Sequence, residues 1–148
     1  MAGRSGPLRV RLTLDEQGAH LATAHDLQPD PAHWTFRLAA QHTNSRDELL
    51  RHKTSWRELY EQPHTDCDEL LFCNERGELT EGARSNLFVR RGGVLLTPPL
   101  EAGLLPGVLR AELIAQGRAK EAILTPGDLD GEVYFGNSLR GLIRAIRL

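Results

Sequence analysis

Two short stretches of this 148-residue chain hold the side chains best suited to catalysis. Lys53 lies beside a short run of helix-forming residues, and Glu81 lies in a glycine-flanked bend before an apolar strand. A lysine amine can form a Schiff base with an aldehyde cofactor, and a carboxylate can hold the protonated nitrogen of a pyridine ring. Single lysines and turn carboxylates are more often solvated surface groups, so this interpretation depends on the pattern around the two residues.

Composition narrows the class of protein. A hydrophobic content of 40% and a charged content of 26% are typical of a globular domain. The net charge of -2 gives no overall field that favours nucleic acid or an anionic membrane, so neither is expected as a partner. No apolar run reaches the roughly 18–20 residues of a membrane helix, and the first residues lack the apolar segment of a secretory signal. We therefore expect a cytoplasmic protein whose cysteines, Cys67 and Cys73, stay reduced.

Metal chemistry is not indicated by the sequence. The histidines and cysteines lack the close Cys-x-x-Cys or His-x-x-x-His spacing that holds zinc. No metal site is therefore expected.

The elements that must position Lys53 and Glu81 are mostly strands. Residues 8–14 alternate between apolar and polar side chains, which predicts a strand with one buried face. Turns rich in glycine, proline and acidic residues separate the further apolar runs. We expect strands at 19–24, 34–38, 70–73, 86–90, 94–97, 122–124, 132–135 and 142–148.

Helices are few. The spacing of Trp56, Leu59 and Tyr60 predicts a short helix over residues 54–61. A longer, largely buried helix is expected over residues 108–115. Many strands, hairpin-like turns and few helices together predict an α+β (mixed α/β) fold, with a curled antiparallel or mixed sheet and one long helix packed on it.

Six segments resemble the fold-type IV family of pyridoxal-phosphate enzymes, in the same order and at similar spacings. That family includes branched-chain aminotransferases, D-amino-acid aminotransferases and aminodeoxychorismate lyases. The segments are His52-Lys53-Thr54, Asp68-Glu69-Leu70-Leu71, residues 77–82, Ser85-Asn86-Leu87-Phe88, residues 97–110 and residues 135–141. Residues 137–142 most resemble the lyase domain that follows the chorismate-processing component of para-aminobenzoate synthase. The resemblance implies the large domain of this fold, a pseudo-barrel, with pyridoxal 5'-phosphate as its cofactor.

The resemblance implies catalytic roles for two residues. Lys53 would bind the cofactor aldehyde and carry the proton, and Glu81 would hold the pyridine nitrogen. Leu105 would pack on the face of the ring. Arg57 and Arg140 would be candidate receptors for a substrate carboxylate, although exposed arginines are common on protein surfaces.

The resemblance also implies two segments for the cofactor phosphate. The backbone amides of Gly107, Val108 and Leu109 begin the longer predicted helix, and the first amides of a helix have no partner within it. Asn137 and Ser138 would form the second phosphate loop. Pro106-Gly107 could equally mark only the start of a helix.

The expected reaction is conversion of 4-amino-4-deoxychorismate to para-aminobenzoate and pyruvate, a step in folate biosynthesis. Two alternatives stay open: an aminotransferase of branched-chain or D-amino acids, and a catalytically silent domain that assembles with a chorismate-processing component. Family members form homodimers, and a homodimer is expected here. About fifty residues precede Lys53, too few for the family's small first domain. We therefore expect residues 1–40 to be terminal strands left from, or linked to, that domain, and residues 41–148 to bind the cofactor.

Overall fold

The first 31 residues form a unit of their own. The structure is a computed structural model that describes residues 6–61 and 66–148, and its chain divides into the compact units 1–31 and 32–148. Strands β1 (Leu8–Leu14) and β2 (His20–Asp26) pair antiparallel in the first unit, as predicted. The buried face predicted for residues 8–14 is wrong: the side chains of β1 are exposed, because this unit has only two strands and no second layer in its described part.

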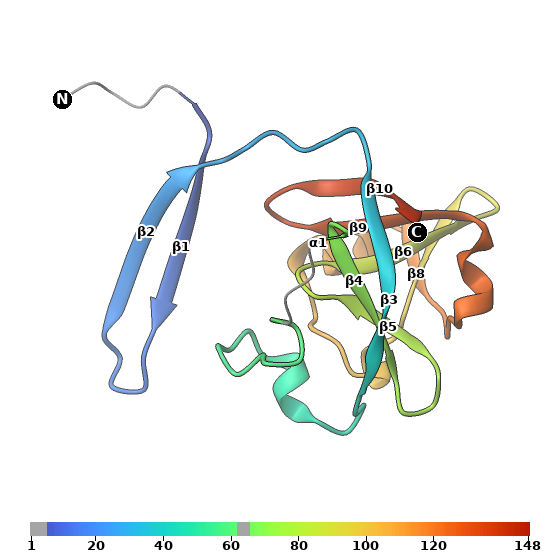
Figure 1. Ribbon diagram of the computed structural model, residues 1–148, viewed down its shortest axis with the longest axis horizontal. Helices are drawn as coiled ribbons and strands as arrows, with labels where there is room; N and C mark the ends of the chain where they lie inside the picture. The colour runs from blue at the N-terminus through green and yellow to red at the C-terminus, as the bar shows by residue number, and fades with distance from the viewer. Residues whose placement is uncertain (1–5, 62–65) are drawn as a thin grey trace. The chain divides into compact units, whose positions relative to one another are not determined.

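The larger unit contains a mixed eight-stranded sheet (Figure 1). Among its described residues, the helical elements are α1 (Val108–Ala115) and three short 3-10 turns, η1 (Glu48–Arg51), η2 (Leu100–Ala102) and η3 (Pro126–Asp130). Its strands are β3 (Trp34–Thr43), β4 (Glu69–Asn74), β5 (Leu79–Gly82), β6 (Asn86–Arg91), β7 (Val94–Thr97), β8 (Ala119–Glu121), β9 (Glu132–Asn137) and β10 (Gly141–Arg147). Strand β3 runs through residue 40, where a domain boundary was predicted.

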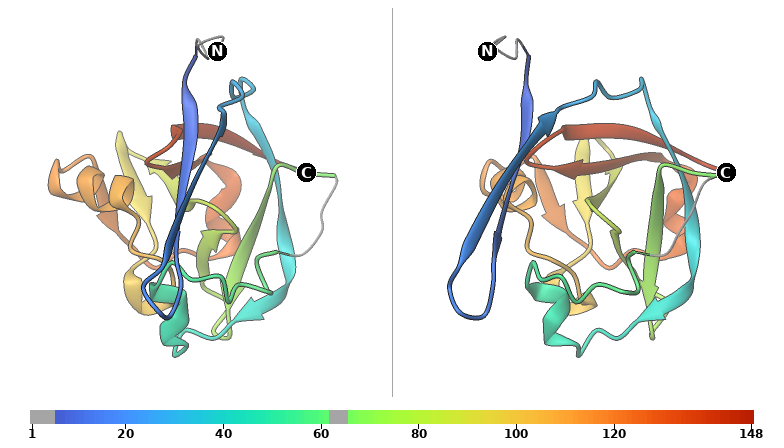
Figure 2. Two further views of the ribbon diagram at one scale, coloured as in Figure 1. Left: turned by 90° about the vertical axis from the view of Figure 1, so that its left-hand side faces the viewer. Right: turned by 60° about the vertical axis from the view of Figure 1, so that its left-hand side comes forward.

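Six of these strands close into a barrel. The order is β5-β4-β3-β10-β9-β6-β7-β8, and an additional β5–β6 pairing joins the ends of the first six strands. Strand β3 runs parallel to both β4 and β10, and the other neighbours in the ring are antiparallel. Figure 2 shows the strands curving around a common interior. The predicted α+β fold with a curled mixed sheet is confirmed.

Alternate residues of the same strand face the barrel interior and helix α1. In β6, Leu87 and Val89 belong to the main core, whereas Phe88 packs with Leu113 of α1 in a second cluster. The middle of strand β6 is therefore buried on both faces, which explains its apolar run Leu87-Phe88-Val89. The main core consists of Trp34, Phe36, Leu71, Cys73, Leu79, Leu87, Val89, Leu124, Leu129, Val133, Phe135, Ile143 and Ala145.

Two predicted elements differ from the structure. Residues 54–61 form turns instead of a helix: the amide of Arg57 bonds to the carbonyl of Ser55, and that of Tyr60 to the carbonyl of Arg57. Trp56 is 76% exposed while Tyr60 is buried, so these aromatics do not share a face. A run this short is a marginal helix in water, and tertiary contacts decide its conformation.

The second difference is strand β8. It spans Ala119–Glu121, three residues before the predicted strand at 122–124, because parallel pairing with β7 uses these residues. Leu124 still enters the core, and its carbonyl accepts a hydrogen bond from the amide of Leu79.

Candidate functional site

Glu81 lies at the centre of the candidate site, at the end of β5. Its side chain is buried, with the residue 2% exposed. The Tyr60 hydroxyl donates to Oε1 at 3.2 Å, while the Asn86 amide nitrogen (3.3 Å) and the backbone N–H of Leu105 (3.2 Å) donate to Oε2. The Arg57 guanidinium lies 3.8 Å from Oε1. Both carboxyl oxygens are thus held by groups from distant segments of the chain.

Burial outweighs these contacts in setting the charge of Glu81. Loss of water raises the pKa of Glu81 to about 8, although the Arg57 charge and the donors from Leu105 and Tyr60 each oppose the rise. A second buried carboxyl, Glu69, adds a small increase. Near neutral pH, Glu81 is therefore largely a neutral acid with a proton that it can donate.

Asn86 connects Glu81 to the start of α1. Its amide nitrogen also donates to the carbonyl of Leu105 at 3.0 Å. Its Oδ1 sits so close to Gly107 that a Cβ placed on residue 107 would lie only 2.0 Å away. Gly107 is required here for space, since its φ of -63° suits any residue. The predicted residues 81, 105 and 107 are therefore brought together, with Asn86 between them.

The start of α1 presents free backbone amides. Gly107 is the N-cap residue, and neither a side-chain cap nor an acidic residue occupies this first turn. The amides of Val108 and Leu109 therefore keep the uncompensated positive end of the helix. The helix is anchored by Arg110, which is 3% exposed and donates to the carbonyl of Pro98 at 2.8 Å while pairing with Glu121.

The second predicted phosphate segment lies beside this helix start. A Cβ on Gly136 would meet Leu109 Cδ2 at 2.9 Å, so β9 and the first turn of α1 touch. The side-chain Nδ2 of Asn137 donates a hydrogen bond to the carbonyl of Arg84 at 3.2 Å, in the turn after Glu81. Its Oδ1 accepts hydrogen bonds from the backbone amides of residues 139 and 140. Ser138 is exposed and Arg140 is half-buried.

Lys53 is exposed, and no hydrogen bond or ion pair joins it to Glu81 in the described part of the chain. Its segment nevertheless reaches the site, because Arg57 and Tyr60 follow it by four and seven residues. Tyr60 packs on Phe72 of β4, with ring centroids 4.7 Å apart. The segment is therefore fixed against the barrel next to Glu81.

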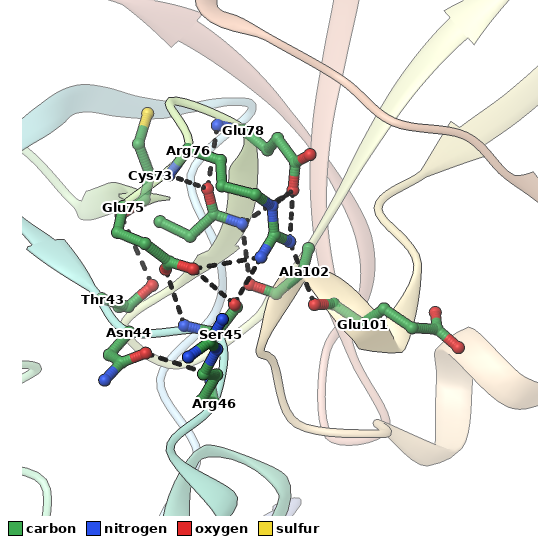
Figure 3. Close-up of polar contacts among 11 residues, drawn as sticks. Thr43, Asn44, Ser45, Arg46, Cys73, Glu75, Arg76, Glu78, Glu101 and Ala102 are labelled. Carbon is green, nitrogen blue, oxygen red and sulfur yellow. Dashed lines mark hydrogen bonds and ion pairs between the residues drawn. The ribbon is translucent and has the colours of Figure 1, made fainter.

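A polar junction, defined by Ser45, Asn74, Glu75, Arg76 and Glu78, joins the segments that lead into the site. Figure 3 shows Ser45, Glu75, Arg76 and Glu78 meeting in this junction. Ser45 donates to Glu75 from both its amide (2.8 Å) and its hydroxyl (2.6 Å). Arg76 contacts Ser45, Glu75 and Glu78 with its guanidinium.

The junction extends to the segment before α1. Asn74 donates to the carbonyl of Ala102 at 3.1 Å, and Arg76 donates to the carbonyl of Glu101 at 3.2 Å. Gly103 follows with φ of 87°, and a Cβ there would lie 2.7 Å from Ser45 Cα. The chain leading to Lys53, the strand carrying Glu81 and the loop leading to Gly107 are thus fixed to one another.

Comparison with known proteins identifies the family. The model of the family described as "Amino-transferase class IV" matches residues 4–148, nearly the whole chain. The chain belongs to the class IV amino-transferase family. Enzymes of this family depend on pyridoxal 5'-phosphate, so the predicted membership of a pyridoxal-phosphate enzyme family is confirmed.

The relatives of this class IV chain include both aminotransferases and lyases. It is 33% identical over 84 residues to the "Aminodeoxychorismate lyase" of Bacillus subtilis, covering 57% of this chain and 26% of the relative. It is 34% identical over 56 residues to the "Probable branched-chain-amino-acid aminotransferase" of Thermotoga maritima, covering 38% of this chain and 20% of that relative. The chain thus spans about a quarter or less of these curated relatives.

A solved structure matches the class IV fold closely. The "Putative amino-acid aminotransferase" of Mesorhizobium loti superposes with a TM-score of 0.90 at 48% identity, covering 95% of this chain and 73% of that one. The predicted pseudo-barrel of this family is confirmed.

The residues of this class IV chain fit the cofactor at both of its polar ends. A buried acid that is protonated near neutral pH suits the pyridine nitrogen, and uncapped helix amides suit the phosphate. Sequence patterns missed Tyr60, which was placed on a helix face, whereas the structure buries it against Glu81. No local sequence signal points to this contact, because Tyr60 and Glu81 are 21 residues apart in the chain.

The described residues contain no cluster of metal-binding side chains. In ranges 6–61 and 66–148, no group of three or more histidine, cysteine or acidic side chains is arranged to hold a metal. Among the same residues, no helix has the length and apolar character needed to cross a membrane. Cys67 and Cys73 are free thiols.

Proposed function

We propose that this chain carries the cofactor-binding residues of a class IV lyase that converts 4-amino-4-deoxychorismate to para-aminobenzoate and pyruvate. The observation that supports a cofactor site is the convergence of Glu81, Asn86 and the open first turn of α1. Support for the lyase reaction comes from the resemblance of residues 137–142 to a lyase domain and from the match to the Bacillus subtilis lyase over 84 residues.

Each residue has a defined task in this proposal. Glu81 would hold the pyridine nitrogen, the amides of Val108 and Leu109 would hold the phosphate with help from Asn137 and Ser138, and Leu105 would cover the ring. When bound, pyridoxal phosphate supplies a ring that withdraws electrons from the substrate carbon next to the amine.

The amine of Lys53 would attach the cofactor and, once the substrate amine has displaced it, would act as the base. Its Nζ would accept the proton from the ring carbon beside the substrate nitrogen. Loss of the enolpyruvyl group, released as pyruvate, would leave the aromatic product. An amine is useful for this only when part of it is unprotonated, which burial under substrate and cofactor favours.

An aminotransferase is the second candidate. It is favoured by the 48% identity to the Mesorhizobium loti protein and by the Thermotoga maritima relative, whose names describe aminotransferases. Both reactions begin with the same proton removal, and substrate contacts decide between them. Arg57 and Arg140 stay predictions as carboxylate receptors, as do a homodimer and a complex with a chorismate-processing component.

Cofactor binding is the first test. Titration with pyridoxal phosphate should produce a visible absorption band that borohydride removes irreversibly. The chain contains only two lysines, so Lys53→Ala should abolish the band while Lys120→Ala, on the exposed part of β8, should keep it. A band that survives Lys53→Ala would contradict the proposal.

The reaction is tested separately. Pyruvate release from 4-amino-4-deoxychorismate should exceed glutamate formation from 2-oxoglutarate and an amino donor. The reverse result would favour the aminotransferase. Cofactor binding with neither product would favour the catalytically silent alternative, and light scattering would test the homodimer.

A further inference from the structure

Arg57, Tyr60 and Glu81 form one connected unit. The Arg57 guanidinium lies over the Tyr60 ring, 4.4 Å from its centroid, and the Tyr60 hydroxyl donates to Glu81 Oε1 at 3.2 Å. Arg57 also approaches the same oxygen at 3.8 Å and donates to the carbonyl of Ala83 at 3.4 Å. Tyr60 and Arg57, which follow Lys53 in the chain, thus both contact the carboxyl of Glu81, and Arg57 also contacts the turn after it.

Neither side chain is free for a different position. Tyr60 is buried against Phe72 and Ala83, and the Arg57 side chain is 19% exposed. Burial is the largest cause of the raised pKa of Tyr60, and the adjacent Glu81 adds to it. The hydroxyl therefore keeps its proton and remains a hydrogen-bond donor. The contact to Glu81 is therefore a donated hydrogen bond at any ordinary pH.

Few charged groups lie near Glu81, so each of them has a clear effect on the pKa of its carboxyl. Arg57 is the near cation, Tyr60 and the Leu105 amide are donors, and Glu69 of β4 is the near acid. Arg57, Leu105 and Tyr60 all favour the carboxylate, whereas burial and Glu69 favour the acid. Removing Arg57 or Tyr60 should therefore leave Glu81 protonated up to a higher pH.

We propose that Arg57 and Tyr60 are positioning residues that aim the Glu81 carboxyl and set its protonation for the cofactor's pyridine nitrogen. This inference rests on the proposed function in giving Glu81 that partner. It gives Arg57 a task at Glu81, in place of a substrate carboxylate. A lone buried acid would stay protonated, whereas Arg57 and Tyr60 stabilise the anion that remains after Glu81 has passed its proton to the ring nitrogen.

The chain contains a matched control on its surface. Arg90 pairs with Glu132 at 3.0 Å and lies 5.4 Å from the centroid of the Tyr134 ring, and the Tyr134 hydroxyl donates to Glu132 at 3.1 Å. The same three residue types therefore make the same three contacts, but all three contacts lie where solvent screens them. Variants at Arg90 and Tyr134 repeat the chemical change without the buried acid.

The test is an infrared pH titration of the cofactor-free protein. The carbonyl stretch of a protonated carboxyl that disappears in Glu81→Gln belongs to Glu81, and it should fade with a midpoint near pH 8. Tyr60→Phe should raise this midpoint, and Arg57→Met should raise it further, by about one pH unit or more. Tyr134→Phe and Arg90→Met should leave it unchanged. Equal midpoints in wild type, Tyr60→Phe and Arg57→Met would overturn the inference.

A second measurement separates this inference from the proposed function. Pyridoxal phosphate should bind more weakly to Tyr60→Phe and Arg57→Met than to the surface variants. Lack of binding by the wild type would refute the proposed function and would leave the infrared result to be judged alone. A merely structural role would lower the melting temperature without moving the Glu81 midpoint.

Discussion

Replacing Glu81 with glutamine should remove a large pH dependence of folding. In the unfolded chain this carboxyl titrates near 4.5, and in the folded chain burial raises its pKa to about 8. Between these values the folded protein holds a proton that the unfolded chain has released. Stability from this group is therefore complete below pH 4.5 and declines as pH rises to about 8.

The size of this stability change follows from the shift in the pKa of Glu81. A change from 4.5 to about 8 corresponds to about 5 kcal/mol at roughly 1.4 kcal/mol per pH unit. Glutamine stays neutral and keeps most of the shape, so the variant should lose this decline and become more stable than wild type above pH 8. Glu69, whose pKa is also raised by burial, should leave a smaller decline of the same sign in the variant.

The assay is urea unfolding from pH 5 to 9, followed by fluorescence of the buried Trp34. The carboxyls of Glu75, Glu78 and Asp128 have pKa values lowered by their hydrogen bonds, so they act mainly below this range. Contributions from all other residues are common to both proteins and cancel in the difference between their stabilities. Parallel stability curves for wild type and Glu81→Gln would refute the argument, because they would mean that Glu81 is charged in the folded protein.

Three further changes test the supports of the site. Gly107→Ala should cost about 1–3 kcal/mol in urea unfolding and weaken phosphate binding, because its Cβ would collide with Asn86 Oδ1, whereas Gly127→Ala has room and should be nearly neutral. Glu121→Gln should cost about 1–3 kcal/mol by leaving the buried Arg110 without its counter-ion, whereas Glu132→Gln at the surface should cost under about 1 kcal/mol. Ser45→Ala should cost about 1 kcal/mol and lower the affinity for pyridoxal phosphate without changing the barrel, as circular dichroism would show.

Strand content and the class of fold could be predicted because they depend on local patterns. Alternating or continuous apolar runs marked most strands, and Pro106-Gly107 marked the start of α1. The positions of Glu81 and of the helix start relative to each other could be predicted only through the family resemblance. The closing β5–β6 pairing rests on the register Glu81↔Asn86, which no single stretch of sequence specifies.

Residues 54–61 show why the rest could not be predicted. Their helix-like spacing is a local preference worth little over eight residues. Tertiary contacts oppose this preference. Tyr60 is buried on Phe72, and Arg57 and Tyr60 contact Glu81, which lies on a strand more than twenty residues further along the chain. Those contacts require the two side chains to point in one direction while Trp56 points outward, and a regular helix cannot do this. The departure from the local pattern therefore lies where the chain holds its buried acid, as expected when a site determines the conformation of the segment around it.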